Sequence, residues 1–140
     1  MGDRSSVTFV TTEEGNERLI QECDKLNDER GITYPLLGSS IEPEELSHEE
    51  GCVIFGWPDI KWYSSYDTVK VVENAYNTIK ELNFPAERLV IGVAWNDVEY
   101  ENCSGDPRLP VHVQPRCEPV VVIEELPDSM QRKTFARRFT

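Results

Sequence analysis

The chain has 140 residues, 39% of them hydrophobic and 29% charged, so it can bury one core of its own and is too apolar to be wholly disordered. Its net charge is −12, and a body this acidic repels nucleic-acid phosphate and anionic membranes. The sequence contains no apolar run long enough for a transmembrane helix and begins without the apolar stretch of a signal peptide, so we expect a cytoplasmic protein.

The first predicted elements are a strand over residues 5–11 and a helix that follows it. The strand segment alternates and is rich in β-branched residues. Thr11 and Glu14 have the spacing of a capping box, which places the start of the helix after Thr11. Gly31 is expected to end this helix in a left-handed conformation. The apolar stripe of the helix consists of Leu19, Ile20, Cys23 and Leu26.

Residues 32–37 predict a short edge strand or extended segment, because Pro35 cannot donate to a strand ladder. Residues 38–51 are polar and are expected to form an exposed acidic loop, with one helical turn at residues 43–46. Five glutamates fall within nine residues of this segment, the densest acidic stretch in the chain.

Residues 52–63 predict a buried strand that ends, turns or bulges at Pro58 and Asp59. Ser64 or Ser65 is expected to cap a second helix, which Asn83, Phe84 and Pro85 end. The apolar positions of that helix recur at helical spacing: Val69, Val72, Tyr76, Ile79 and Leu82.

Residues 88–101 predict a long strand whose apolar first half gives way to acidic residues on the same side. Residues 102–119 are expected to be a long loop, with a brief strand at residues 111–113. A final strand is predicted at residues 119–126, followed by a short helix or tail.

The order of these elements predicts an α+β fold, with two amphipathic helices packed on one face of a four- to five-stranded, mostly antiparallel sheet. The first six elements also match the split β-α-β order of ferredoxin-like folds. We expect one acidic domain over residues 1–127 and a basic C-terminal helix or tail over residues 128–140. The first 131 residues carry 26 acidic and 10 basic side chains, a net charge of −16, and all charges beyond them are positive.

Known catalytic patterns are missing from the sequence, including phosphate-binding loops, metalloprotease motifs and nucleophile elbows. The four cysteines have no standard metal-binding spacing and predict reduced thiols. We therefore assign no catalytic or metal-binding residue, expect no cofactor, and leave open whether the protein is an enzyme.

The distribution of charge leads to the functional hypothesis of a non-enzymatic interaction module that docks on a basic protein, without direct nucleic-acid or membrane binding. Immunity proteins and phage DNA mimics inhibit or regulate nucleic-acid-handling proteins in this way. The alternatives are a small carboxylate-dependent enzyme or metal- or ligand-binding protein around His112, and a structural subunit of a larger assembly. Eight acids are predicted to carry the charge and two aromatic residues to anchor the partner: Glu42, Glu44, Glu45, Glu49, Glu50, Asp97, Glu99 and Glu101, with Trp62 and Tyr63.

Overall fold

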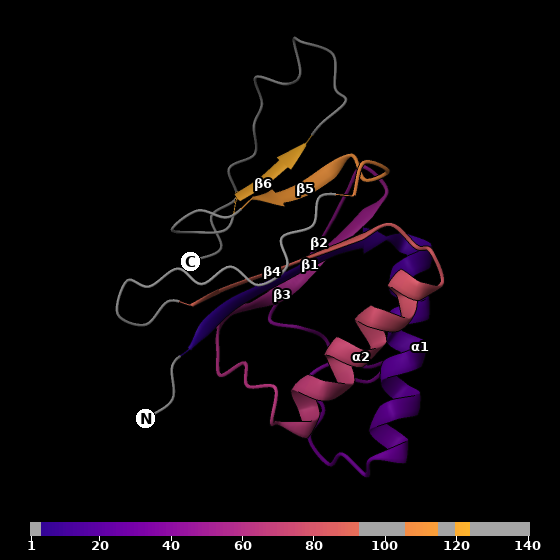
Figure 1. The fold of residues 1–140 in the computed structure, drawn as a ribbon, viewed down its shortest axis with the longest axis vertical. Coiled ribbons are helices and arrows are strands. Elements are labelled where there is room, and N and C mark those ends of the chain that lie inside the picture. Colours follow the sequence, from indigo (N-terminus) through magenta and orange to yellow (C-terminus); the bar gives the residue numbers. More distant parts are fainter. Residues whose placement is uncertain (1–3, 93–105, 115–119, 124–140) are drawn as a thin grey trace.

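The fold is seen in a computed structural model that describes residues 4–92, 106–114 and 120–123 (Figure 1). Within these residues the elements in chain order are β1 (Ser5–Thr12), α1 (Glu13–Glu29), β2 (Glu45–Glu49), β3 (Cys52–Ile60), α2 (Asp67–Glu81), β4 (Ala86–Gly92), β5 (Val111–Gln114) and β6 (Val120–Ile123).

The main sheet has four strands in the order β2-β3-β1-β4, and each neighbouring pair is antiparallel. Together with the chain order β-α-β-β-α-β, this is the split β-α-β arrangement of a ferredoxin-like topology. Strands β5 and β6 form a separate antiparallel pair. The predicted α+β class with a four-stranded antiparallel sheet is therefore confirmed.

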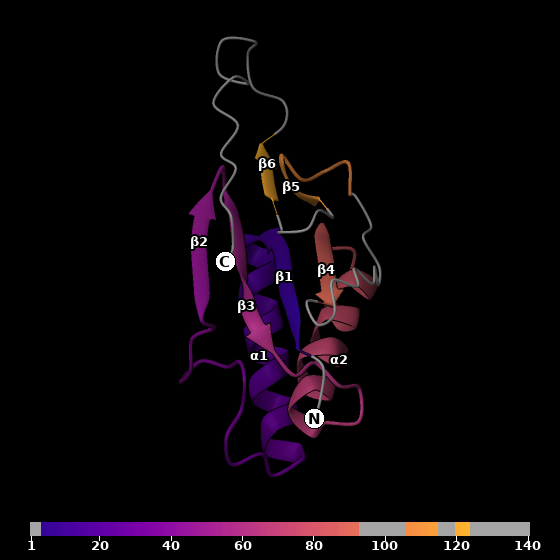
Figure 2. The same ribbon diagram turned by 90° about the vertical axis from the view of Figure 1, so that its left-hand side faces the viewer.

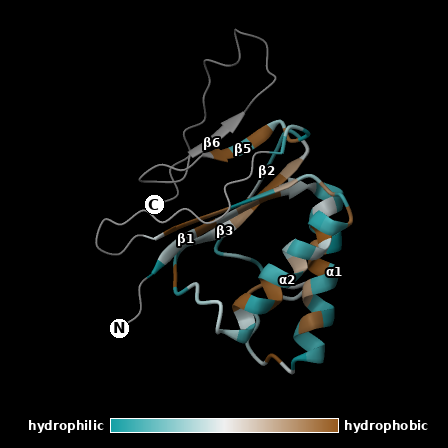
Figure 3. Ribbon diagram, viewed as in Figure 1, coloured by the Kyte–Doolittle hydropathy of each residue, from teal (hydrophilic) through white to brown (hydrophobic). Residues whose placement is uncertain are grey.

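Both helices cover the same face of the sheet, and Figure 2 shows them together behind β1, β3 and β4. The two-residue period of β1 and β3 places Phe9 and Phe55 opposite one another on this face, where their rings stack 5.2 Å apart. The buried side of α1 adds Leu19 and Cys23, and α2 adds Val72, Ala75, Tyr76 and Ile79. Teal and brown bands along α1 and α2 in Figure 3 follow the predicted amphipathic pattern.

The opposite face of the sheet has a second, smaller core. Val10, Ile54 and Leu89 point to this side because they alternate with the helix-facing residues of their strands. Val111 and Val113 of β5 pack against them, and both are almost fully buried. The sheet is therefore covered on both faces, by helices on one and in part by β5 on the other (Figure 1).

The ends of α1 follow the sequence signals, with one correction. The N-cap is Thr12 rather than Thr11, and its hydroxyl accepts a hydrogen bond of 3.0 Å from the Gly15 amide. Thr11 remains in the strand and donates to the Pro85 carbonyl instead. At the other end Gly31 has a φ of 62°, and the Gly31 and Ile32 amides bond back to the last turn as in a Schellman motif.

Two expectations for residues 32–51 are wrong. Residues 32–37 contain bends and no strand, and Leu37 at the end of this segment is buried against the core. Residues 45–49 form β2 rather than a loop or helical turn. The pairing of β2 with β3 supplies the ladder bonds that its glutamate-rich composition would not predict, because tertiary pairing overrides β-propensity.

Strand β3 confirms the predicted irregularity near Pro58. The register with β1 shifts between Trp57 and Ile60, so one extra residue bulges from β3. The predicted cap of α2 is wrong: Tyr66 precedes the helix without a side-chain cap bond, and the acid in the first turn is Asp67, where the helix dipole favours a negative charge.

Several predictions lie outside the described residues. These are the acidic half of the strand predicted at residues 88–101, most of the loop at 102–119, and the basic tail at 128–140. Within the described part, β4 covers Ala86–Gly92 and β5 confirms the brief strand around His112. None of the described helices is both long and apolar enough to cross a membrane.

Candidate functional site

The acidic stretch of the sequence forms the outer edge of the sheet. Within the described residues β2 pairs with β3 on one side and with no strand on the other. Glu42, Glu44 and Glu50 are exposed, while Glu45 and Glu49 are half-buried. The structure therefore places all five predicted glutamates at one edge. We call residues 42–50 the acidic edge.

The alternation of β2 sends its side chains to two faces. Register with β3 aligns Leu46 with Phe55 and His48 with Val53, so these two β2 side chains lie on the helix-covered face. Glu45 and Glu49 therefore lie on the opposite face of the sheet. His48 Nδ1 lies 3.8 Å from a Glu13 carboxylate oxygen, but both side chains are mostly exposed, so this contact contributes little stability.

Burial and like charge act together on Glu45. Partial desolvation raises the pKa of Glu45 above its ordinary value, and the neighbouring Glu44 carboxylate raises it further. Both causes disfavour the ionised form. At Glu45 the fold therefore tolerates an electrostatic cost.

A small groove runs beside β2 on the helix-covered face. Its volume is about 210 Å³, which is enough for one large side chain. Leu46 and Ile41 are 44% and 37% exposed beside it, although both are aliphatic. The rest of the lining mixes apolar and polar residues: Ile20, Leu37, Pro43 and Phe55 with Asn16, Gly38, Ser39 and Glu42.

Trp62 does not reach the surface, contrary to its predicted role as an anchor. Its ring stacks on Trp57 at 5.4 Å, it is only 9% exposed, and its Nε1 donates to Glu73 at 2.9 Å. Tyr63 is half-buried and meets the exposed Tyr66 edge to face at 5.2 Å. The two tyrosines are the aromatic residues left to serve as anchors in this segment.

The tyrosine pair is separated from the tip of the acidic edge. It follows the far end of β3, whose nine residues begin at the Glu50–Gly51 turn. At the usual rise per residue, β3 puts roughly 30 Å between the two ends. The structure brings the five glutamates together but does not bring Tyr63 to their tip. Asp97, Glu99 and Glu101 lie outside the described residues.

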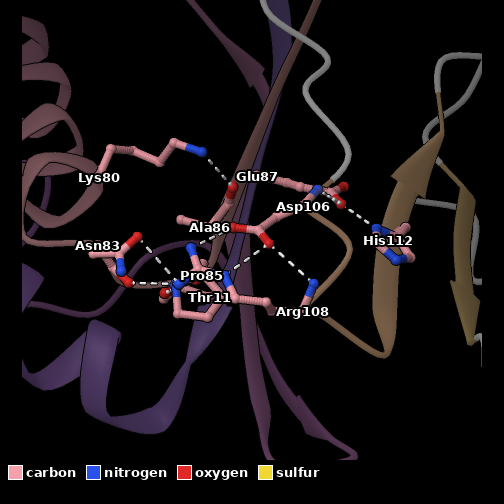
Figure 4. Close-up of polar contacts among 9 residues, drawn as sticks. All are labelled: Thr11, Lys80, Asn83, Pro85, Ala86, Glu87, Asp106, Arg108 and His112. Carbon is pink, nitrogen blue, oxygen red and sulfur yellow. Dashed lines mark hydrogen bonds and ion pairs between the residues drawn. The ribbon is translucent and has the colours of Figure 1, made fainter.

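A second polar cluster, between β4 and the segment that leads into β5, was not predicted from the sequence (Figure 4). Glu87, on β4, is 2% exposed and contacts His112 Nδ1, and it also accepts hydrogen bonds from the Val113 and Asp106 amides. These bonds attach the start of β5 to β4. The only sequence signal was an acid at a position that alternates with Leu89 and Ile91 in β4, so that the two-residue period would have placed it facing β5.

Asp106 and Arg108 extend this cluster toward the turn after α2. Arg108 makes two charge-assisted bonds to the Asp106 carboxylate, at 3.1 and 2.9 Å, and a third bond of 2.8 Å to the Asn83 carbonyl. The Arg108 hydrogen bond is the main reason that the pKa of Asp106 is lowered to about 2. Because Glu87 binds residues 106, 112 and 113, and Arg108 binds the Asn83 carbonyl, the cluster attaches residues 106–114 to β4 and to the turn after α2.

The part of the chain that the structure describes contains no group of three or more His, Cys, Asp or Glu residues placed to hold a metal ion. Buried thiols do not supply an activated nucleophile there either. Desolvation raises the pKa of Cys23 to about 12, with Asp24 and Glu22 adding to the effect, and burial likewise raises the pKa of Cys52.

Comparison of the chain with family models, with curated proteins and with solved structures finds no match. The functional argument therefore depends on the residues themselves.

Proposed function

We propose that this protein is a non-enzymatic interaction module that docks on a basic protein through the acidic edge. The observation that carries the proposal is the collection of five glutamates along the edge of the sheet where β2 pairs with no other described strand. Charge is also crowded at this edge, since partial burial and then the neighbouring Glu44 carboxylate raise the pKa of Glu45.

The acidic edge would act first on the rate of association. Clustered carboxylates on a protein of net charge −12 attract a basic surface at long range and repel acidic ones. A nucleic-acid-handling protein offers such a basic surface, because it neutralises phosphates with lysine and arginine. The protein would then occupy that surface as an inhibitor or regulator, in the manner of immunity proteins and phage DNA mimics.

Affinity purification from the source organism tests the proposal when it is combined with two charge variants. In the first variant the five glutamates become glutamine, which changes the net charge from −12 to −7. The matched control has the same net charge, but its five exposed acids are converted to amides elsewhere: Glu17, Asp28, Glu29, Asp59 and Glu81.

The expected result is a basic partner that elutes with increasing salt, is retained by the control and is lost by the acidic-edge variant. Equal recovery by the two variants would show that total charge, and not the acidic edge, drives binding. A partner that resists salt, or one that is itself acidic, would contradict the proposal.

A further inference from the structure

We propose that the outer edge of β2, which pairs with no other described strand, takes up an extended, basic segment of the partner as an additional strand, with one apolar side chain of that segment seated in the groove beside Leu46. This inference rests on the proposed function and names how the same surface recognises its partner. Its support comes from the backbone of β2, the groove and the charge of the acidic edge.

The backbone geometry identifies which groups are offered. Glu50 and Gly51 both have positive φ, 50° and 76°, as the central residues of a two-residue hairpin turn of type I′. Such a turn is closed by a hydrogen-bonded pair, here Glu49 with Cys52, and bonded pairs then alternate along the strands. Leu46 and His48 therefore direct their N–H and C=O groups outward.

No hydrogen bond between described residues uses these outward groups of Leu46 and His48. An edge of this kind pairs readily with another extended chain, whose main-chain bonds supply affinity. Alternate side chains of the added strand point to the helix-covered face, where the groove lies. Leu46 and Ile41 would be buried by a single aliphatic or aromatic side chain placed there.

Charge decides which kind of chain fits. A second copy of the protein would set glutamate against glutamate along the paired edges, and like charges opposite one another destabilise a strand pair. A segment in which lysine or arginine flanks an apolar residue instead meets Glu42 and Glu44 near one end of β2 and Glu50 at the other. The chemistry of the edge therefore favours a basic segment of another protein.

The test uses full-length protein and a synthetic peptide in which lysine alternates with valine around a central leucine. Binding is measured by fluorescence anisotropy, and amide chemical shifts locate it. We expect the peptide to shift the amides of Leu46 and His48. Two further peptides carry N-methyl groups on one or the other alternate set of amides, and we expect only the set that faces β2 to abolish binding.

A pair of substitutions makes the matching test on the protein. In the His48→Pro variant the proline ring replaces the outward N–H and blocks pairing with an added strand. No bond to β3 is removed, since proline is tolerated where an edge N–H faces solvent. His48→Ala removes the imidazole and keeps the edge. We expect His48→Pro to weaken the peptide by about tenfold or more and His48→Ala by less than about twofold.

Two outcomes separate this inference from the proposed function. Strand addition is wrong if the His48→Pro variant binds the unmodified peptide as tightly as the wild type does, and if the wild type also binds both N-methylated peptides that tightly. The proposed function would survive that result provided that binding still falls with salt and with the glutamine variant of the acidic edge. If the peptide binds no more tightly than an acidic peptide of the same pattern, both proposals fail, and the glutamates serve only to keep the edge from aggregating.

Discussion

At the scale of single residues, Glu73 connects three parts of the core. Its Oε2 atom accepts a bond of 2.9 Å from Trp62 Nε1 and another of 2.9 Å from Arg88 Nε, so one carboxylate joins α2, β4 and the segment before α2. The Arg88 side chain is only 7% exposed. Removing one partner of such a pair leaves the other charge desolvated and uncompensated.

Arg88→Met tests this contact. We expect the free energy of unfolding to fall by about 2–3 kcal/mol, less than for a fully buried pair because Glu73 is 22% exposed. Urea denaturation at neutral pH measures the change. Arg18→Met is the matched control: its pair with Glu22 lies on the surface of α1, and we expect a loss below about 1 kcal/mol. Equal losses would mean that the Glu73 contact stabilises no more than a surface pair.

The lowered pKa of Asp106 predicts a pH dependence of stability. A carboxyl whose pKa is lower in the folded state contributes stability above its unfolded pKa and loses it as pH falls through the folded value. For Asp106 that window extends from the ordinary value of 3.8 down to about 2. The wild type should therefore lose stability as pH falls across it.

Asp106→Asn should make the loss of stability in this window smaller, as measured by urea denaturation at several pH values. Asp59→Asn, at a side chain that is 64% exposed, should leave the slope unchanged. If Asp106→Asn and the wild type have the same slope between pH 3.8 and about 2, the contact with Arg108 does not persist in solution.

At the scale of elements, the sequence predicted the helices and strands whose apolar pattern is set by burial in the core. The periodicity of α1 and α2 and the apolar alternation of β1 and β3 correspond to core positions, because burial selects residue type strongly. The exception is Leu82, predicted on the apolar stripe of the second helix, which follows α2 and is 48% exposed. Strand β2 was missed because its glutamates lie on the outermost described strand of the sheet, where composition says little about conformation. The Glu50–Gly51 turn before the buried Cys52–Phe55 run was the available hairpin signal.

The candidate site was predictable only in part for the same reason. Local sequence density placed the five glutamates together, and the structure keeps them at one edge. Trp62 was misplaced because an indole beside polar residues looks exposed in sequence, whereas its partner Glu73 comes from the following helix. The buried Glu87 contacts depend on residues 106–113, which no local pattern connects to β4.

The β2–β3 turn predicts a substitution that stabilises the fold and also removes one charge from the acidic edge. Glu50 has a φ of 50°, a conformation that asparagine adopts more easily, and Asn-Gly is the preferred type I′ pair. Glu50→Asn should therefore raise the free energy of unfolding by about 0.5–1 kcal/mol while removing one charge from the acidic edge. Thermal denaturation measures this change.

Glu44→Asn is the control for the turn prediction, because it removes a charge from an exposed residue that lacks positive φ. Equal stabilisation by Glu44→Asn and Glu50→Asn would attribute the gain to reduced repulsion and not to the backbone of the turn.

At the scale of the whole molecule, a net charge of −12 opposes the compact state through self-repulsion. Salt screens exposed charges over a Debye length of about 10 Å at 0.1 M ionic strength. Stability at neutral pH should therefore rise as sodium chloride is added from low concentration to about 0.2 M. Urea denaturation along that series measures the slope.

The variant with five glutamines at the acidic edge should show a smaller salt slope than its matched control at the same net charge of −7, because its removed charges were close together. Partial burial and then the adjacent Glu44 carboxylate raise the pKa of Glu45, which is consistent with this crowding. If the two variants have equal slopes, repulsion is spread over the molecule and not concentrated at β2. A smaller salt slope for the acidic-edge variant would mean that much of the charge repulsion in the free protein lies at β2. A basic partner bound there would relieve this repulsion, so the same charges would affect both binding and folding stability.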